Sequence, residues 1–130
     1  DLGFEAQEIN LQTGTQIQSQ TRPKFTLKLE YFSKKPSKVI EDNFRESIIL
    51  GRSSKADIVL KDYQDISGMH AKIYSQGDYL LIDDLGSTNH TFLNGARVYA
   101  KCPISNGDLL KLGIHEFKIF IKNYEDLTYE

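Results

Sequence analysis

The stretch SIILGRSSKADIVLKDYQDISGMHAKIY, Ser47 to Tyr74, alternates short apolar runs with polar loops that contain glycine. Its runs are SIILGR (47–52), DIVL (57–60) and HAKIY (70–74). Short runs of aliphatic residues between turn residues are typical of β-strands. The loops between them, LGRSSKAD and KDYQDISGMH, carry more polar and glycine residues than a connection requires, which makes them candidates for binding.

The same pattern continues on both sides of this stretch. From Phe25 to Phe32 apolar and polar residues alternate as in a half-buried strand. Further runs are YLLID (79–83), TFLN (91–94), LLKLG (109–113) and EFKIFI (116–121). Residues 37–46 are ambiguous, and neither a long helical pattern nor a βαβ alternation is present. The sequence therefore predicts an all-β fold, a two-sheet β-sandwich.

Length and composition predict one domain with two tails. At 130 residues the chain is long enough for a single core. Residues 1–24 are rich in Gln and Thr and predict a flexible tail, 25–122 hold the domain, and 123–130 form a C-terminal tail. Because the chain begins with Asp1 and contains one methionine, Met69, we expect it to be part of a longer protein.

Charge and cysteine content exclude several classes of protein. Lys and Arg number 16 against 18 Asp and Glu, a net charge of -2, which disfavours a nucleic-acid partner. The single cysteine, Cys102, excludes an internal disulfide and indicates a reducing compartment, nuclear or cytoplasmic. No run is long enough to span a membrane, and no signal peptide begins the chain, so no membrane partner is expected.

A third loop rich in polar residues and glycine, DLGSTNHTFLNG (84–95), follows YLLID, and four short motifs follow one another in these three loops. They are Gly51-Arg52, Ser67 and His70 in SGMH, GSTN (86–89), and Asn94-Gly95. In this order and in a strand-rich chain they resemble the forkhead-associated (FHA) domain over about Phe25 to Lys122. The resemblance implies a β-sandwich whose loops at one end bind phosphothreonine peptides.

The residues themselves suit phosphate binding. A dianionic phosphate needs a fixed cation and several donors, and the guanidinium of Arg52 offers a planar fork that matches its oxygens. The hydroxyls of Ser67 and Thr88 can donate to the same group. The alternatives are a solvated surface charge for Arg52 and ordinary turn capping for the hydroxyls. The resemblance implies that Arg52, Ser67 and Thr88 hold the phosphate and that Asn89 bonds the peptide backbone.

Other motif positions are predicted to be structural. By resemblance, His70 ties the binding loops together with hydrogen bonds. Gly51 and Gly86 allow a close backbone approach or a positive φ. Asn94-Gly95 is a strong signal for a two-residue hairpin.

Two positions depart from the family pattern. Gly68 stands where the family often has a polar or basic side chain that reaches the phosphate, so it offers only its N–H, and Lys55 is the candidate that compensates. His90 stands where glycine is usual and must accept an unusual φ. Asp65 lies two residues before Ser67 and is a candidate for selecting Lys or Arg downstream of the phosphothreonine; the alternative is a solvated acidic turn.

Other functions fit the sequence less well. The sequon NHT (89–91) would require a secreted protein. Cys102 and the three histidines match no metal-ligand spacing, and no nucleophile motif, P-loop or dinucleotide fingerprint occurs, so neither an enzyme nor a cofactor is expected. The sequence predicts a noncatalytic recruitment module that binds a phosphothreonine-containing protein. The alternative is a structural interaction domain of the same fold that binds an unphosphorylated surface.

The N-terminal tail adds one further hypothesis. Thr15-Gln16 and Ser19-Gln20 resemble sites of kinases that signal DNA damage, although a tail with no such role is the alternative. If Thr15 is phosphorylated, it becomes a ligand for the site of a neighbouring copy. The sequence thus allows self-association that depends on phosphorylation.

Overall fold

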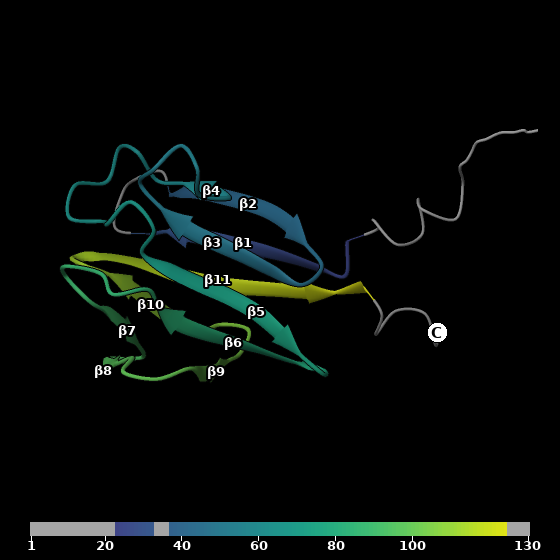
Figure 1. The fold of residues 1–130 in the computed structure, drawn as a ribbon. Coiled ribbons are helices and arrows are strands. Elements are labelled where there is room, and N and C mark those ends of the chain that lie inside the picture. Colours follow the sequence, from purple (N-terminus) through teal and green to yellow (C-terminus); the bar gives the residue numbers. More distant parts are fainter. Residues whose placement is uncertain (1–22, 33–36, 125–130) are drawn as a thin grey trace, which may run out of the picture.

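The computed structural model describes residues 23–32 and 37–124, and these form strands and turns without an α-helix. The strands build two sheets packed face to face (Figure 1). The six-stranded sheet has the order β2-β1-β11-β10-β7-β8 and the five-stranded sheet the order β4-β3-β5-β6-β9. The bounds are β1 (Phe25–Tyr31), β2 (Lys38–Phe44), β3 (Ser47–Gly51), β4 (Ile58–Val59), β5 (Ala71–Gln76), β6 (Tyr79–Asp84), β7 (Thr91–Leu93), β8 (Ala96–Arg97), β9 (Cys102–Ile104), β10 (Leu109–Leu112) and β11 (His115–Asn123). The predicted all-β sandwich is confirmed.

The alternation read from residues 25–32 is what fills the core. In β1, Leu27 and Leu29 are fully buried, and they lie opposite Ile121 and Ile119 in the antiparallel register with β11. Ile73 of β5 and Ile82 of β6 pair with each other and are also fully buried. The inner faces of the two sheets therefore supply the apolar contact that stabilises the sandwich.

Three strands were not predicted from the sequence. The ambiguous residues 37–46 contain β2, which lies at the edge of its sheet and has only Phe44 buried. An edge strand held mainly by backbone pairing with β1 needs no apolar alternation, so its pattern gave no strand signal. The short strands β8 and β9 were also missed, because a strand of two or three residues has too few positions to show a period.

The two ends of the described chain meet at one end of the sandwich. The N–H of Tyr124 donates to the carbonyl of Lys24 at 2.9 Å. The loops that carry Gly51-Arg52, SGMH and GSTN lie at the opposite end (Figure 1), and the Asn94-Gly95 turn follows the short strand β7 that leaves this end. Most of the proposed N-terminal tail, including Thr15 and Ser19, and residues 125–130 of the C-terminal tail lie outside the described residues. Within the described ranges no helix is long and apolar enough to cross a membrane.

Candidate functional site

Two of the motif loops are tied together along their backbones. The N–H of Arg52 donates to the carbonyl of Ser67, and the N–H of Ser53 donates to the carbonyl of Gly68, each at 3.0 Å. Gly51 makes this approach possible, because a Cβ at position 51 would stand 2.0 Å from the Gly68 carbonyl oxygen. From the sequence we expected a close backbone approach or a positive φ at Gly51, and the structure shows a close approach to the Gly68 carbonyl.

Arg52 is exposed, and its guanidinium is held by a hydrogen bond to the backbone of the second loop. Its Nε donates to the carbonyl oxygen of Ile66 at 3.1 Å. Ile66 itself is buried in the hydrophobic core, so the acceptor of this hydrogen bond belongs to a residue packed in the core. The bond uses one of the five guanidinium hydrogens and leaves the two terminal NH2 groups to contact a ligand.

Ser67 connects the second loop to the third. Its Oγ accepts a hydrogen bond from the N–H of Thr88 at 3.0 Å. A hydroxyl that accepts one bond still has its own proton to donate. Ser67 therefore offers an oriented donor beside Arg52, and the exposed Thr88 hydroxyl lies one residue before Asn89.

Asn89 and Asp65 hold each other across the same two loops. The Asn89 Nδ2 donates to the backbone carbonyl of Asp65 at 3.0 Å. Asp65 has a φ of 74°. A Cβ at Gly113, in the turn between β10 and β11, would stand 2.8 Å from the same Asp65 carbonyl oxygen. The backbone of Asp65 is thus fixed from two sides, while its side chain is exposed.

His70 is fully buried beneath these loops. Its Nδ1 accepts the N–H of Ser67 at 3.0 Å, and its Nε2 lies 2.9 Å from the carbonyl oxygen of His90. Because Nδ1 accepts, the imidazole is neutral with its proton on Nε2, which donates to His90. Burial lowers the pKa of His70 below its ordinary value, in agreement with a neutral ring.

Asp84 fixes the start of the third loop. Its Oδ2 accepts the N–H groups of Gly86 and Ser87 at 3.0 and 2.9 Å, and its Oδ1 accepts the hydroxyls of Ser87 and Thr91 at 2.5 and 2.6 Å. Burial raises the pKa of Asp84, but the hydrogen bonds from Ser87 and Thr91 outweigh it and hold the pKa below its ordinary value. The carboxylate therefore shapes the backbone just before Thr88.

Several turn positions have the backbone angles that the sequence led us to expect. Gly86 has a φ of 74° and His90 a φ of 73°. Asn94 and Gly95 both have positive φ, and they connect β7 to β8 as a two-residue hairpin. His90 thus adopts an angle that glycine tolerates better, and its carbonyl is the acceptor for His70.

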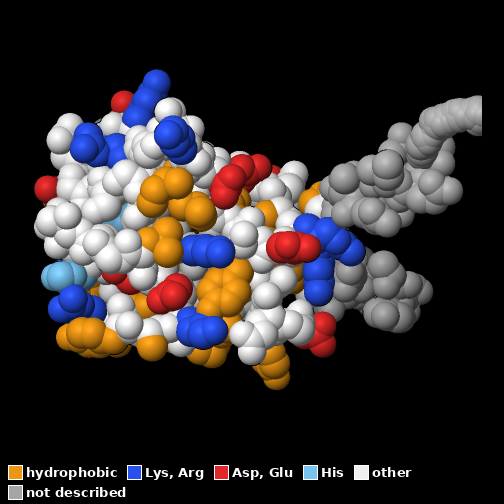
Figure 2. Space-filling model, in the orientation of Figure 1, with side chains coloured by type: hydrophobic (Ala, Val, Ile, Leu, Met, Phe, Trp, Pro, Cys, Tyr) orange, Lys and Arg blue, Asp and Glu red, His pale blue; other side chains and the backbone are white. Residues whose placement is uncertain are grey.

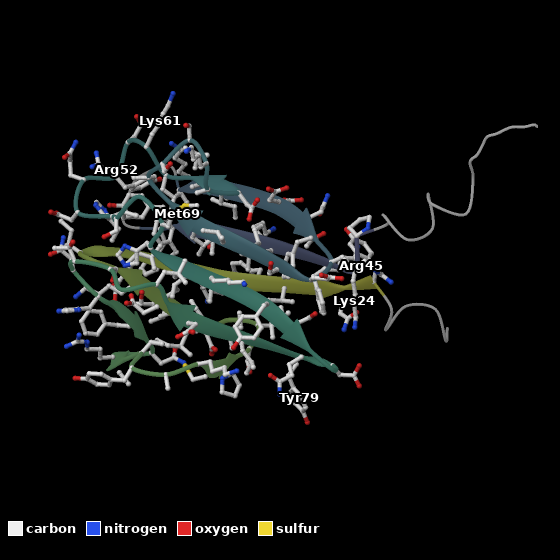
Figure 3. The ribbon with its side chains drawn as sticks, in the orientation of Figure 1. Lys24, Arg45, Arg52, Lys61, Met69 and Tyr79 are labelled. Carbon is white, nitrogen blue, oxygen red and sulfur yellow. The ribbon has the colours of Figure 1, made fainter. Side chains whose placement is uncertain are left out.

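A surface hollow of about 210 Å³ adjoins Arg52. It is lined by Arg52, Ser53, Lys61 and Gly68. Figure 3 labels Arg52 and Lys61 at the loop end, and Figure 2 shows several blue side chains gathered there. The N–H of Lys55 donates to the Ser53 Oγ at 3.0 Å, but Lys55 does not line the hollow.

The structure thus brings Arg52, Ser67, Gly68, Thr88 and Asn89 to one end of the sandwich, and what they bind stays a prediction. Sequence reasoning missed two residues there. Lys61 carried no signal, because its place beside Arg52 depends on how two loops fold together. Asp84 had one: an Asp three residues before a Ser at the end of a strand is typical of a side chain that caps a turn.

The part of the chain that the structure describes contains no cluster of side chains that could bind a metal ion. No group of three or more His, Cys, Asp or Glu side chains lies close enough to hold an ion within residues 23–32 and 37–124. His115 instead bonds the Tyr31 hydroxyl through Nδ1 at 3.0 Å and the Gln64 carbonyl through Nε2 at 2.6 Å.

Known proteins resemble this chain in sequence and in fold. The family model of the FHA domain matches residues 48–113. The FHA domain-containing protein FhaB of Mycolicibacterium smegmatis is 31% identical over 68 residues, which cover 52% of this chain and 43% of FhaB, and FhaB of Mycobacterium tuberculosis matches equally. The matched part therefore spans less than half the length of these curated relatives.

Solved structures agree over a larger part of the chain. One, from a structural and functional analysis of phosphothreonine-dependent FHA domain interactions, is 33% identical with a TM-score of 0.61 and covers 74% of this chain and 94% of that chain. The FHA domain of FhaA, solved with the intracellular domain of another protein, is 32% identical with a TM-score of 0.60, covering 73% and 98%. Mycobacterium tuberculosis EmbR with a low-affinity phosphopeptide is 26% identical with a TM-score of 0.62, covering 75% of this chain and 25% of that one.

Proposed function

This chain belongs to the FHA domain family, and on that premise we propose that it is a phosphothreonine-dependent recruitment module of a larger signalling protein. The observation that carries the proposal is the fixed pair of Arg52 and Ser67. The Arg52 Nε is bound to the Ile66 carbonyl, and the Ser67 Oγ is bound to the Thr88 N–H, so both side chains are held before any ligand arrives. Preorganised donors lose little freedom on binding, which favours affinity.

The phosphate is contacted by four groups in this proposal. The two terminal NH2 groups of Arg52 form charge-assisted hydrogen bonds to its oxygens. The hydroxyls of Ser67 and Thr88 donate to the same oxygens. The Gly68 N–H, for which no bond occurs within the described residues, is the fourth donor. This arrangement neutralises part of the phosphate charge and satisfies several of its lone pairs.

Asn89 aligns the peptide beside the phosphate. One of its amide hydrogens is used on the Asp65 carbonyl, so the side chain cannot rotate freely. Its Oδ1 and second amide hydrogen then meet the peptide backbone of the ligand. Asn89 therefore orients the bound peptide, and the residues that contact the phosphate distinguish the phosphorylated peptide from the unphosphorylated one.

Relatives of known structure support the phosphate ligand. A structure 33% identical to this chain comes from work on phosphothreonine-dependent FHA domain interactions, and one 26% identical holds a phosphopeptide. The proposal extends to the domain limits, with 25–122 as the binding domain between residues 1–24 and 123–130. The proposed function includes no catalysis, and it stays a prediction that the chain binds no nucleic acid, membrane, metal or cofactor. The location of the protein also stays a prediction. The curated relatives are bacterial and give no support to a nuclear location.

Isothermal calorimetry tests the proposal with a peptide first selected from an oriented phosphothreonine library. The selected peptide should bind, and its unphosphorylated form should not. A phosphoserine form should bind about fourfold more weakly if the γ-methyl is buried, since one methyl group contributes about 0.8 kcal/mol. Equal affinity for the phosphorylated and unphosphorylated peptides would overturn the proposal in favour of a structural interaction domain.

Association between copies through the N-terminal tail extends the same proposal. Residues 15 to 25 reach at most about 33–36 Å when fully extended. The nine residues of β11 alone run about 30 Å from the loop end to the end where the chain enters the domain. A phosphorylated Thr15 therefore reaches the site of a neighbouring copy more readily than its own. Light scattering should find concentration-dependent association only with phosphorylated Thr15, and a phosphorylated chain that stays monomeric at high micromolar concentration would refute this extension.

A further inference from the structure

Gly68 leaves an unfilled place beside Arg52. A Cβ at position 68 would have the Ser53 Cβ, at 3.6 Å, as its nearest neighbour, which is ordinary van der Waals contact. Gly68 also does not have the positive φ found at other glycines of the chain, such as Gly86. Neither space nor backbone conformation therefore demands glycine here, and the missing side chain contributes to the open hollow between the loops.

The charge of a phosphate is only half matched by Arg52. A phosphothreonine carries about -1.5 to -2 charges at pH 7, and Arg52 supplies one positive charge. The neighbouring loop KDYQDISGMH, which carries Gly68, also carries Asp62 and Asp65, both exposed, which oppose an anion. A second cation close to Arg52 would balance the site.

Lys61 is the cation that the fold brings to this hollow. We propose that Lys61 supplies the second positive charge to the phosphothreonine phosphate, in place of the side chain that Gly68 lacks. Lys61 lines the hollow together with Arg52 and Gly68. The hollow has a volume of about 210 Å³ and is open to solvent, so a phosphate bound by Arg52 would lie in the same surface depression as Lys61.

The backbone fixes where Lys61 starts. The N–H of Leu60 donates to the carbonyl of Gly51 at 2.7 Å, and the Leu60 side chain is 1% exposed. Arg52 follows Gly51 and Lys61 follows Leu60, so this hydrogen bond brings the backbones of Arg52 and Lys61 close together. Lys61 is itself exposed, and its side chain extends outward from the loop in Figure 3, so its flexible stem turns toward Arg52 when a phosphate binds in this proposal. The sequence suggested Lys55 for this role, but Lys55 does not line the hollow.

The inference rests on the proposed function, and its test uses a matched pair of lysines. Lys61→Gln should weaken binding of the selected phosphothreonine peptide about three- to tenfold in calorimetry, the range for one exposed ion pair to a doubly charged group. Lys118→Gln, which replaces an exposed lysine of β11 that does not line the hollow, should leave binding unchanged. Raising the salt concentration should narrow the difference between wild type and Lys61→Gln. Thermal unfolding should be the same for all three chains.

A second variant separates a missing charge from a disturbed loop. Gly68→Lys, which the space beside Ser53 accommodates, should restore the affinity when added to Lys61→Gln. Wild-type affinity in Lys61→Gln, an equal loss in Lys118→Gln, or no rescue by Gly68→Lys would each overturn the role of Lys61. These outcomes differ from failure of the proposed function, in which the wild-type chain binds the phosphorylated and unphosphorylated peptides equally.

Discussion

The Nδ1 of the His70 imidazole accepts a hydrogen bond from the N–H of Ser67 at 3.0 Å, so a buried ring beneath the loops positions a residue of the candidate site. The other ring nitrogen bonds the His90 carbonyl at 2.9 Å. A proton added to Nδ1 would remove the acceptor for Ser67. The neutral ring is therefore the form compatible with this arrangement of the loops.

Stability of the ligand-free chain should fall as the pH drops below about 6.5. Burial lowers the pKa of His70 in the folded chain, while the unfolded chain keeps the ordinary value of 6.5. The unfolded state then binds more protons, so stability is complete above 6.5 and is lost from there down to the lower folded pKa. Urea unfolding between pH 7.5 and 5 measures this slope.

His70→Gln identifies the residue responsible for the slope. The free energy of unfolding of this variant should fall by about 1–3 kcal/mol at pH 7.5, because the Ser67 N–H and the His90 carbonyl lose their hydrogen-bond partners on the imidazole. Its stability should also depend less on pH. An unchanged slope in His70→Gln would refute the assignment.

Gly51→Ala should disrupt the contact between the first two loops. The added Cβ would stand 2.0 Å from the Gly68 carbonyl oxygen, a backbone atom that cannot turn away. We expect a loss of about 1–3 kcal/mol in free energy of unfolding, the usual cost of overpacking, together with weaker peptide binding. Gly68→Ala is the control, since its Cβ meets nothing closer than 3.6 Å and should leave stability nearly unchanged. Similar stabilities for the two variants would contradict this packing.

Asp84→Asn should loosen the third loop. One carboxylate oxygen becomes an NH2 group that faces donors from Ser87 and Thr91 or from the backbone, so about 1–3 kcal/mol of stability should be lost. The neighbouring Asp83→Asn should cost little. The pKa of Asp84 lies below its ordinary 3.8, so wild-type stability from this group is present above 3.8 and is lost as the pH falls further. A thermal unfolding midpoint equal to that of Asp83→Asn would count against the role of Asp84.

Asp65 should favour Lys or Arg a few residues after the phosphothreonine. Its backbone is fixed by Asn89 and by the turn at Gly113, while its carboxylate is exposed for contact with a ligand. Asp65→Asn is the informative variant, because asparagine accepts a φ of 74° and only the charge is removed. In a peptide library this variant should lose the basic preference, and Asp78→Asn, in the turn between β5 and β6, should keep it. An acidic or apolar preference in the wild type would exclude the assignment.

The sequence predicted what depends on local pattern and missed what depends on loops meeting in space. The alternation in residues 25–32 and the Asn94-Gly95 pair specify a strand and a hairpin by themselves, and both were found. The edge strand β2 buries almost nothing and so has no periodicity to read. Lys61 lies nine residues from Arg52 in sequence, and the parallel pairing of β3 with β4, continued by the bond from Leu60 to Gly51, brings the two to one hollow.

Arg52→Ala, compared with Arg45→Ala, tests phosphate docking most directly. Arg45 is an exposed arginine at the opposite end of the sandwich (Figure 3). Calorimetry with the selected phosphothreonine peptide should show a loss of about 100-fold or more for Arg52→Ala, because at least two charge-assisted hydrogen bonds are removed. Arg45→Ala should bind like the wild type, and thermal unfolding should show both variants folded. A folded Arg52→Ala chain that binds the phosphopeptide within twofold of the wild type would contradict the account.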